Sequence, residues 1–135
     1  PQTLNALLEA NKDIVAEIFW TKVHPDKDDH RTQVNCWDFG QNDRFEHSKE
    51  TWKKPGLYRV GGTGACILIH RKVFESGVDY SPIYNLKLIG EDRFFSVRAV
   101  CHGFDLWIDT HYPCLHLYRE SELIKYLGGI TNDSE

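Results

Sequence analysis

The sequence predicts an α/β fold in which helices flank a mixed β-sheet. Three observations support this class. Segments with helical periodicity alternate along the chain with segments rich in β-branched and aromatic residues. The composition, with 41% hydrophobic and 27% charged residues, is ordinary for a globular protein. The length of 135 residues suffices for one domain but hardly for two, so we expect a single domain over 1–127 and a flexible tail over 128–135.

The first residues predict a helix and then a strand. Leu4, Leu7 and Leu8 follow the i, i+3, i+4 spacing of a buried stripe, which predicts a helix over 1–11. The segment 13–20 is rich in residues that favour β-structure, so we expect a strand there.

A polar and charged segment without clear periodicity follows at about 21–54. Segments of this length without regular structure are uncommon in compact domains and are usually functional or disordered. Aromatic residues such as Trp37 and Trp52 argue against disorder here. We therefore expect a large loop, with a short helix near 43–50, that forms a lid or a wall of a binding site.

The second half of the chain predicts shorter strands and helices in alternation. The glycine-rich run Gly61–Gly64 lies inside a segment of strand character at 57–70, where glycine permits unusual backbone angles or the close approach of another group. Gly90 and Gly103 bracket the clearest helical pattern of the chain. The other expected elements are a short helix at 71–76, a strand at 104–109, an extended segment at 113–118 and a helix at 120–127.

The formal net charge is −4, and the basic residues do not cluster. Phosphate binding requires a basic surface, so a nucleic-acid partner is not expected. No apolar run approaches membrane-spanning length, so a transmembrane segment is not expected either. The aromatic share of 13% suits core packing, and it also suits stacking on the apolar faces of sugar rings.

The four cysteines are Cys36, Cys66, Cys101 and Cys114. None belongs to a CxxC pair, so a zinc ribbon or a thioredoxin-like site is not expected. Cys66 and Cys101 lie within apolar runs. We therefore expect buried free thiols in a reducing compartment.

Glu91 and Asp92 are the first candidates for chemistry. Two adjacent carboxylates at the start of a helix have a structural explanation, because acidic side chains interact favourably with the unpaired N–H groups there, by about 0.3–1 kcal/mol. They also have a catalytic explanation, because a carboxylate held at the edge of a cleft can take the proton from an attacking hydroxyl. The residues alone leave both explanations open.

His116 is the second candidate, either as a packed side chain or as a metal ligand. As a ligand it would need partners, and an oxygen-rich site would suit Mn²⁺ or Mg²⁺. Asp26, Asp28 and Asp29 are better explained as solvated loop residues, and His111 is an alternative ligand.

Four segments, taken in order, resemble the second half of the GT-A nucleotide-sugar glycosyltransferases of the family 2 type. The opening helix and strand resemble the pair that follows the family's metal-binding Asp-x-Asp motif. The run 62–75 resembles the glycine-containing strand and Arg-x-Val-Phe helix that border the acceptor site. Gly90-Glu91-Asp92 resembles the family's Glu-Asp motif, and 113–119 resembles the segment that carries a metal-ligating histidine and then a basic residue. The resemblance covers about residues 1–120.

The resemblance implies a partial GT-A fold and a metal-dependent, hexosyltransferase-like transfer from a nucleotide-sugar donor to a hydroxyl of a saccharide or other acceptor. In inverting members the Asp of the Glu-Asp motif is the base, which gives Asp92 that role and leaves Glu91 to orient the acceptor or cap the helix. His116 would supply one ligand to Mn²⁺ or Mg²⁺, and Arg119 would hold the diphosphate or simply be exposed. The 113–119 segment also resembles retaining members, so the stereochemistry stays open. The expected substrate contacts are Gly62, Thr63, Gly64, Trp37 and Trp52, with core packing as the alternative for the two tryptophans.

The family's N-terminal half, which holds the nucleotide and the Asp-x-Asp motif, has no counterpart in the sequence. The chain is therefore expected to be a fragment, inactive by itself, whose partners are that half, the donor and the acceptor. The resemblance also suggests a bacterial, cytoplasmic enzyme at the inner face of the membrane. Two other functions stay open. One is a non-catalytic carbohydrate-binding or interaction module derived from a transferase scaffold. The other is a metal-dependent hydrolase, which requires four side chains to converge: Glu91, Asp92, His111 and His116.

Overall fold

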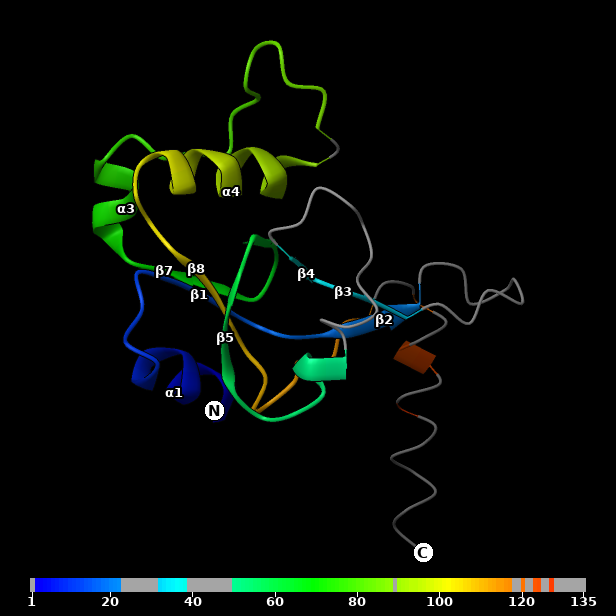
Figure 1. The fold of residues 1–135 in the computed structure, drawn as a ribbon. Coiled ribbons are helices and arrows are strands. Elements are labelled where there is room, and N and C mark those ends of the chain that lie inside the picture. Colours follow the sequence, from blue (N-terminus) through cyan, green and yellow to red (C-terminus); the bar gives the residue numbers. More distant parts are fainter. Residues whose placement is uncertain are drawn as a thin grey trace, which may run out of the picture.

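A four-stranded mixed sheet forms the centre of the fold in the computed structural model (Figure 1). The structure describes residues 2–22, 32–38, 50–88 and 90–117, together with positions 120, 123, 124 and 127. The elements are α1 (Gln2–Glu9), β1 (Ile14–Glu17), β2 (Trp20–Lys22), β3 (Thr32–Val34), β4 (Cys36–Trp37), β5 (Leu57–Val60), β6 (Gly62–Thr63), β7 (Ile67–Ile69), α3 (Arg71–Glu75), α4 (Glu91–Cys101) and β8 (Leu106–Asp109).

The strand order in the central sheet is β5-β8-β1-β7. β1 runs parallel to β8 and antiparallel to β7, while β5 is antiparallel to β8. Two further antiparallel pairs, β2 with β3 and β4 with β6, extend the structure beyond the sheet. In Figure 1, α1 lies on one side of the sheet and α4 on the other. The expected class, an α/β fold with helices flanking a mixed sheet, is therefore confirmed.

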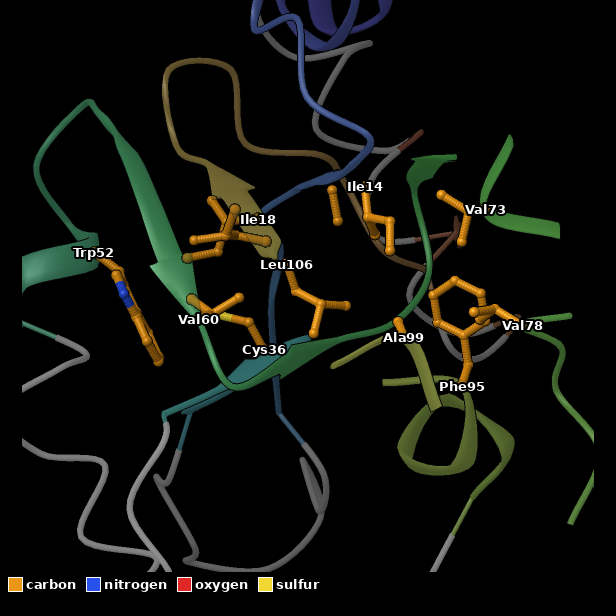
Figure 2. Packing of buried hydrophobic residues seen from close by; sticks show 12 residues of the cluster. Ile14, Ile18, Cys36, Trp52, Val60, Val73, Val78, Phe95, Ala99 and Leu106 are labelled. Atoms are coloured by element: carbon orange, nitrogen blue, oxygen red, sulfur yellow. The ribbon is translucent and has the colours of Figure 1, made fainter. Parts of the chain in front are cut away.

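The hydrophobic core lies between the sheet and α4 (Figure 2). β1 is buried along its whole length, and its first three residues are all apolar rather than alternating with polar residues. Phe95 and Ala99 come from one face of α4, one helical turn apart, and both are fully buried. The same cluster includes Ile14, Ile18, Trp52, Val60, Val73, Val78, Leu106 and Ile108.

Glycines set both ends of α4, as the sequence predicts. Gly90 precedes the helix with a φ of 86°, and Gly103 follows it with a φ of 84°. Side chains other than glycine rarely adopt such angles, so the chain can turn sharply at these two points. The structure describes α1 and α3 close to their expected bounds as well.

The expected large loop at 21–54 contains short strands in its described part. β2 pairs with β3 through Trp20 and Val34, and β4 pairs with β6. Residues 50–52 form a helical turn, whereas the rest of the helix expected near 43–50 lies outside the described residues. Strands of two or three residues are too short to show a period of two, so the sequence pattern could not indicate them.

Three other expectations change. The segment 57–70 is divided into β5, β6 and β7, and residues 113–117 form no strand. In α1 only Leu7 is buried, and the other two leucines of the expected stripe are more than half exposed. Of the helix expected at 120–127 the structure describes four positions, all helical, and the tail 128–135 lies outside the described residues.

None of the helices in the described part of the chain combines the length and the apolar character that crossing a membrane requires.

Candidate functional site

The side chain of Asp92 packs against the backbone of Gly64. A β-carbon added to Gly64 would lie 2.1 Å from Oδ2 of Asp92 and 2.4 Å from its Cγ. No real β-carbon tolerates such distances, so glycine at position 64 makes the space that the carboxylate occupies. This contact joins the start of α4 to the end of β6, the two elements that the resemblance places at the acceptor site.

The local structure of α4 explains how Asp92 reaches this place. The turn at Gly90 starts the helix without a side-chain cap, and the first helical turn carries Glu91 and Asp92. Both carboxylates therefore lie where the helix exposes unpaired N–H groups. Glu91 is exposed, whereas Asp92 is partly buried. Burial, and secondarily the charge of Glu91, raise the pKa of Asp92 above its ordinary value.

The Trp37 ring contacts residues of the same two elements, Gly62 of β6 and Arg93 of α4. A β-carbon on Gly62 would lie 2.1 Å from Cε2 and Cζ2 of the Trp37 indole, so the ring lies directly on the Gly62 backbone. The guanidinium carbon of Arg93 is 5.3 Å from the centre of this ring, within the range of a cation–π interaction. Trp37 is only partly buried. The space that a side chain would fill at Gly62 is thus occupied by an aromatic ring, and the corresponding space at Gly64 is occupied by a carboxylate.

Asn35 holds the glycine-rich run in place, although no pattern in the sequence singles it out. Its side-chain amide donates hydrogen bonds to the carbonyl oxygens of Glu17 and Gly64, both at 2.9 Å. Its Oδ1 accepts a hydrogen bond from the backbone N–H of Phe19 at 3.0 Å. Its own carbonyl accepts from the N–H of Gly64 at 2.8 Å and from the hydroxyl of Thr63 at 3.1 Å. A buried amide with this many partners fixes the backbone under Asp92.

The segment before α4 is held against that helix. Arg98 forms an ion pair with Asp79 at 2.8 Å and donates to the carbonyl oxygens of Asp79 and Ser81 at 3.1 and 2.8 Å. Tyr80, held between these contacts, stacks on Phe95 with ring centres 4.5 Å apart. Burial, then the charges of Asp92 and Glu91, raise the pKa of Tyr80. The Tyr80 hydroxyl therefore belongs to the same electrostatic environment as the two carboxylates, which is another feature that the sequence did not indicate.

Two of the expected substrate contacts have structural roles instead. Trp52 is 5% exposed and belongs to the hydrophobic core, so its ring faces protein rather than an acceptor. The core-packing alternative therefore describes Trp52. Thr63 is 1% exposed, and its hydroxyl donates a hydrogen bond to the carbonyl oxygen of Asn35. Of the expected substrate contacts that the structure describes, Trp37 stays partly exposed, whereas Gly62 and Gly64 are buried under the Trp37 ring and the Asp92 carboxylate.

His116 stacks on Phe19, with ring centres 4.2 Å apart and planes inclined by 8°. This position fits the packed histidine that the sequence offered as the alternative to a ligand. Within the described ranges, no group of three or more His, Cys, Asp and Glu side chains is arranged to hold a metal ion. His116 could therefore contribute one ligand at most, and the described residues do not by themselves fit a divalent-metal centre. Arg119 lies outside the described residues.

The hydrolase alternative fails on the same observation. It required Glu91, Asp92, His111 and His116 to converge on one metal ion, and all four are described. They form no such group. His111 instead pairs with Asp109, whose Oδ1 is 3.0 Å from the ring Nδ1 and 2.8 Å from the backbone N of His111.

A second cluster of ionisable groups lies at the ends of the parallel strands β1 and β8. Glu17 and Asp109 are register partners and are 0% and 4% exposed. Oε1 of Glu17 accepts a hydrogen bond from the N–H of Tyr112 at 3.3 Å, whereas the buried Oε2 has no hydrogen-bond partner among the described residues. Burial, then the charge of Asp109, raise the pKa of Glu17 to about 7. A carboxyl in the middle of a β-rich run was the one signal in the sequence for this cluster.

Comparison with protein-family models finds no match for the chain, and comparison with curated proteins finds none either. The geometry itself defines an α/β domain with a mixed sheet. At one edge of that domain, Asp92 lies against a glycine backbone, with Trp37 and Arg93 beside it.

Proposed function

We propose that this chain forms the acceptor-side part of a GT-A type glycosyltransferase, which moves a sugar from a nucleotide-sugar donor to an acceptor hydroxyl. The observation that carries the proposal is the position of Asp92, a partly buried carboxylate at a helix start that rests on Gly64. Residues that the resemblance assigns to one site, in segments 62–75 and 90–92, are in contact in the fold.

In this proposal Asp92 is the general base. The acceptor hydroxyl gives its proton to the Asp92 carboxylate while its oxygen attacks the anomeric carbon and the nucleoside diphosphate leaves from the opposite face. This geometry inverts the configuration at that carbon. Burial and Glu91 raise the pKa of Asp92, and a carboxylate with a raised pKa is a stronger base for this transfer. Tyr80 and Glu91 shape the charge around the base, and neither needs to exchange a proton with the substrate.

Trp37 and Arg93 position the acceptor. The exposed part of the Trp37 ring offers an apolar face to a sugar ring, and the adjacent guanidinium offers donors for sugar hydroxyls. Gly62 and Gly64 are covered by the Trp37 ring and the Asp92 carboxylate, so in this proposal these two side chains, and not the glycine backbone, meet the acceptor. In this proposal the donor nucleotide and the divalent metal bind to the nucleotide-binding half with the Asp-x-Asp motif that the resemblance implies. The cytoplasmic location is likewise part of the proposal.

The proposal is tested by turnover of a panel of nucleotide-sugar donors in the complete protein, with Asp92→Asn measured beside the unchanged enzyme. Release of nucleoside diphosphate that depends on an added saccharide, and that the variant loses, supports the proposal. Saccharide binding without turnover of any donor would instead identify the non-catalytic carbohydrate-binding module. Turnover that is indifferent to Asp92→Asn would remove Asp92 as the base.

A further inference from the structure

Two thiols that are distant in the sequence meet at the surface of the fold. The sulfur atoms of Cys66 and Cys114 lie 2.9 Å apart, although 48 positions separate the residues. Cys66 is exposed and Cys114 is partly exposed. The sequence predicted buried thiols, and for both Cys66 and Cys101 this is wrong. A disulfide needs its sulfurs about 2.05 Å apart, so the pair is within 1 Å or so of bonding distance.

The backbone holds both cysteines against the same short segment. The N–H of Glu17, the last residue of β1, donates to the carbonyl of Cys66 at 3.0 Å. The N–H of Cys114 donates to the carbonyl of Ile18, the next residue, at 2.8 Å. Two consecutive residues at the end of β1 therefore fix the two thiols relative to each other. Their approach is built into the hydrogen bonding of the fold rather than left to side-chain rotation alone.

The backbone at Cys66 is also held in an uncommon conformation. Ala65 and Cys66 have φ values of 49° and 44°, which residues other than glycine rarely adopt. This turn leads from Gly64 into β7 and aims the Cys66 side chain towards the segment that follows β8. Strained turns of this kind persist where the surrounding structure fixes them, and they cluster at functional positions.

The other two cysteines have no such arrangement. Cys36 is 2% exposed in the hydrophobic core, and Cys101 lies at the exposed C-terminal end of α4. They therefore serve as internal controls, one thiol that is inaccessible and one that is accessible but lacks a neighbouring thiol in the described residues.

We propose that Cys66 and Cys114 are a modification site, at which a small-molecule disulfide of the glutathione type converts the two thiols into one reversible intramolecular disulfide. The more exposed Cys66 attacks as thiolate, breaks the sulfur–sulfur bond of the reagent and releases one thiol. Cys114 then attacks the Cys66 sulfur, transfers its proton to the second leaving thiolate and closes the protein disulfide. Two protein thiols are oxidised, and one small disulfide is reduced to two thiols.

The new bond would join the turn at Cys66, two positions after Gly64, to the segment between β8 and His116. It closes a loop of 48 residues, which stabilises the folded state mainly by restricting the unfolded chain. We expect the melting temperature to rise by on the order of 10 °C on oxidation and to return on reduction. In a reducing compartment the pair stays as thiols, and disulfides that form there are usually transient and redox-sensing. This inference does not depend on the proposed sugar transfer.

The test treats the folded chain with oxidised glutathione and follows it by intact mass spectrometry and peptide mapping. The expected product has lost two hydrogens and contains a Cys66–Cys114 crosslink, which dithiothreitol reverses. Cys114→Ser should stop at a glutathione adduct on Cys66, because the resolving thiol is absent. Cys101→Ser should form the crosslink as the unchanged chain does.

Three outcomes would overturn the inference. The first is a glutathione adduct on Cys66 that persists in the unchanged chain beside a free Cys114. The second is a crosslink that involves Cys101 or a second chain in place of Cys114. The third is absence of reaction while the protein is folded, with a crosslink only after denaturation.

Discussion

The Asp92 carboxylate fills the space above the backbone of Gly64 where a side chain at position 64 would stand. The contact connects the N-terminal turn of α4 with the end of β6, and it accounts for the partial burial that raises the pKa of Asp92. One relationship therefore fixes both the position of the carboxylate and its basicity. The first predictions follow from it.

Gly64→Ala should displace the Asp92 carboxylate while leaving the fold intact. The added methyl group would lie 2.1 Å from Oδ2, so the Asp92 side chain must rotate away. Overpacking of this kind typically costs about 1–3 kcal/mol of stability. Urea unfolding of the variant beside the unchanged chain measures the cost.

A double-mutant cycle with Asp92→Ala separates this clash from other effects of the methyl group. Asp92→Ala removes Cγ and both oxygens and leaves only Cβ, which would lie 3.0 Å from the new carbon. We expect Gly64→Ala to cost less in the Asp92→Ala background than in the unchanged chain, with a coupling energy above about 0.5 kcal/mol. Equal costs in both backgrounds would show that the two residues are not in contact.

The two tryptophans proposed from the sequence should separate into one structural residue and one binding residue. Trp52 is 5% exposed in the core, so Trp52→Ala should lower the free energy of unfolding by about 3–5 kcal/mol. Trp37 is partly exposed, so Trp37→Ala should cost less stability and weaken binding of the saccharide acceptor. Denaturant unfolding and saccharide titration by NMR measure the two effects. Loss of saccharide binding in a stable Trp52→Ala variant would contradict the assignment.

Asn35→Ala should strongly destabilise the fold, because Asn35 is buried. It removes hydrogen bonds to Glu17, Gly64 and Phe19 at 2.9–3.0 Å and leaves the buried Phe19 N–H without this acceptor. Unsatisfied buried groups cost about 1–3 kcal/mol each, so we expect a loss of roughly 2–4 kcal/mol. The matched control is Asn5→Ala on the exposed side of α1, which should change stability by no more than about 0.5 kcal/mol. Similar losses for the two variants would refute the role given to Asn35.

Glu17 should make the stability of the fold fall as pH rises towards and through neutrality. Its pKa is raised from 4.5 to about 7 in the folded chain, so the folded state holds a proton that the unfolded state releases. The stabilisation is complete below pH 4.5 and is lost as pH rises through about 7. At 1.36 kcal/mol per pKa unit the loss is about 3 kcal/mol.

Glu17→Gln should remove most of this pH dependence, because the amide keeps the shape of the protonated carboxyl and carries no charge. Urea unfolding at a series of pH values, with exposed Glu9→Gln as the matched control, measures the effect. We expect the Glu17→Gln variant to be more stable than the unchanged chain above neutral pH. Parallel stability curves for the variant and the unchanged chain would contradict this expectation.

The sequence predicted local features well and tertiary contacts poorly. The ends of α4 were predictable because Gly90 and Gly103 mark them, and the residues that favour β-structure at 13–20 indicated the strand that forms β1. Gly64 was recognised as a point of close approach, yet only the fold shows that Asp92 is the approaching group. The composition of a segment says that it folds, but not which distant side chain it will meet.

Two residues show why the rest was out of reach. Asn35 stands in a polar, charge-rich segment where an asparagine ordinarily faces solvent, and its buried hydrogen bonds depend on strands of two or three residues. Cys66 stands in an apolar run that suggested burial, but positive φ values at Ala65 and Cys66 turn its side chain to the surface. In both cases the backbone path, and not the hydrophobic pattern, decides where the side chain lies.

The role proposed for Asp92 is tested by saccharide-dependent release of nucleoside diphosphate, measured with the complete protein for the unchanged sequence, Asp92→Asn and Glu91→Gln. Loss of a general base costs about 10²–10⁴-fold in rate. We expect a loss of rate of this size for Asp92→Asn with the fold intact. We expect a much smaller loss of rate for Glu91→Gln, because Glu91 is exposed. Full turnover by Asp92→Asn, or an equal loss in both variants, would contradict the role proposed for Asp92.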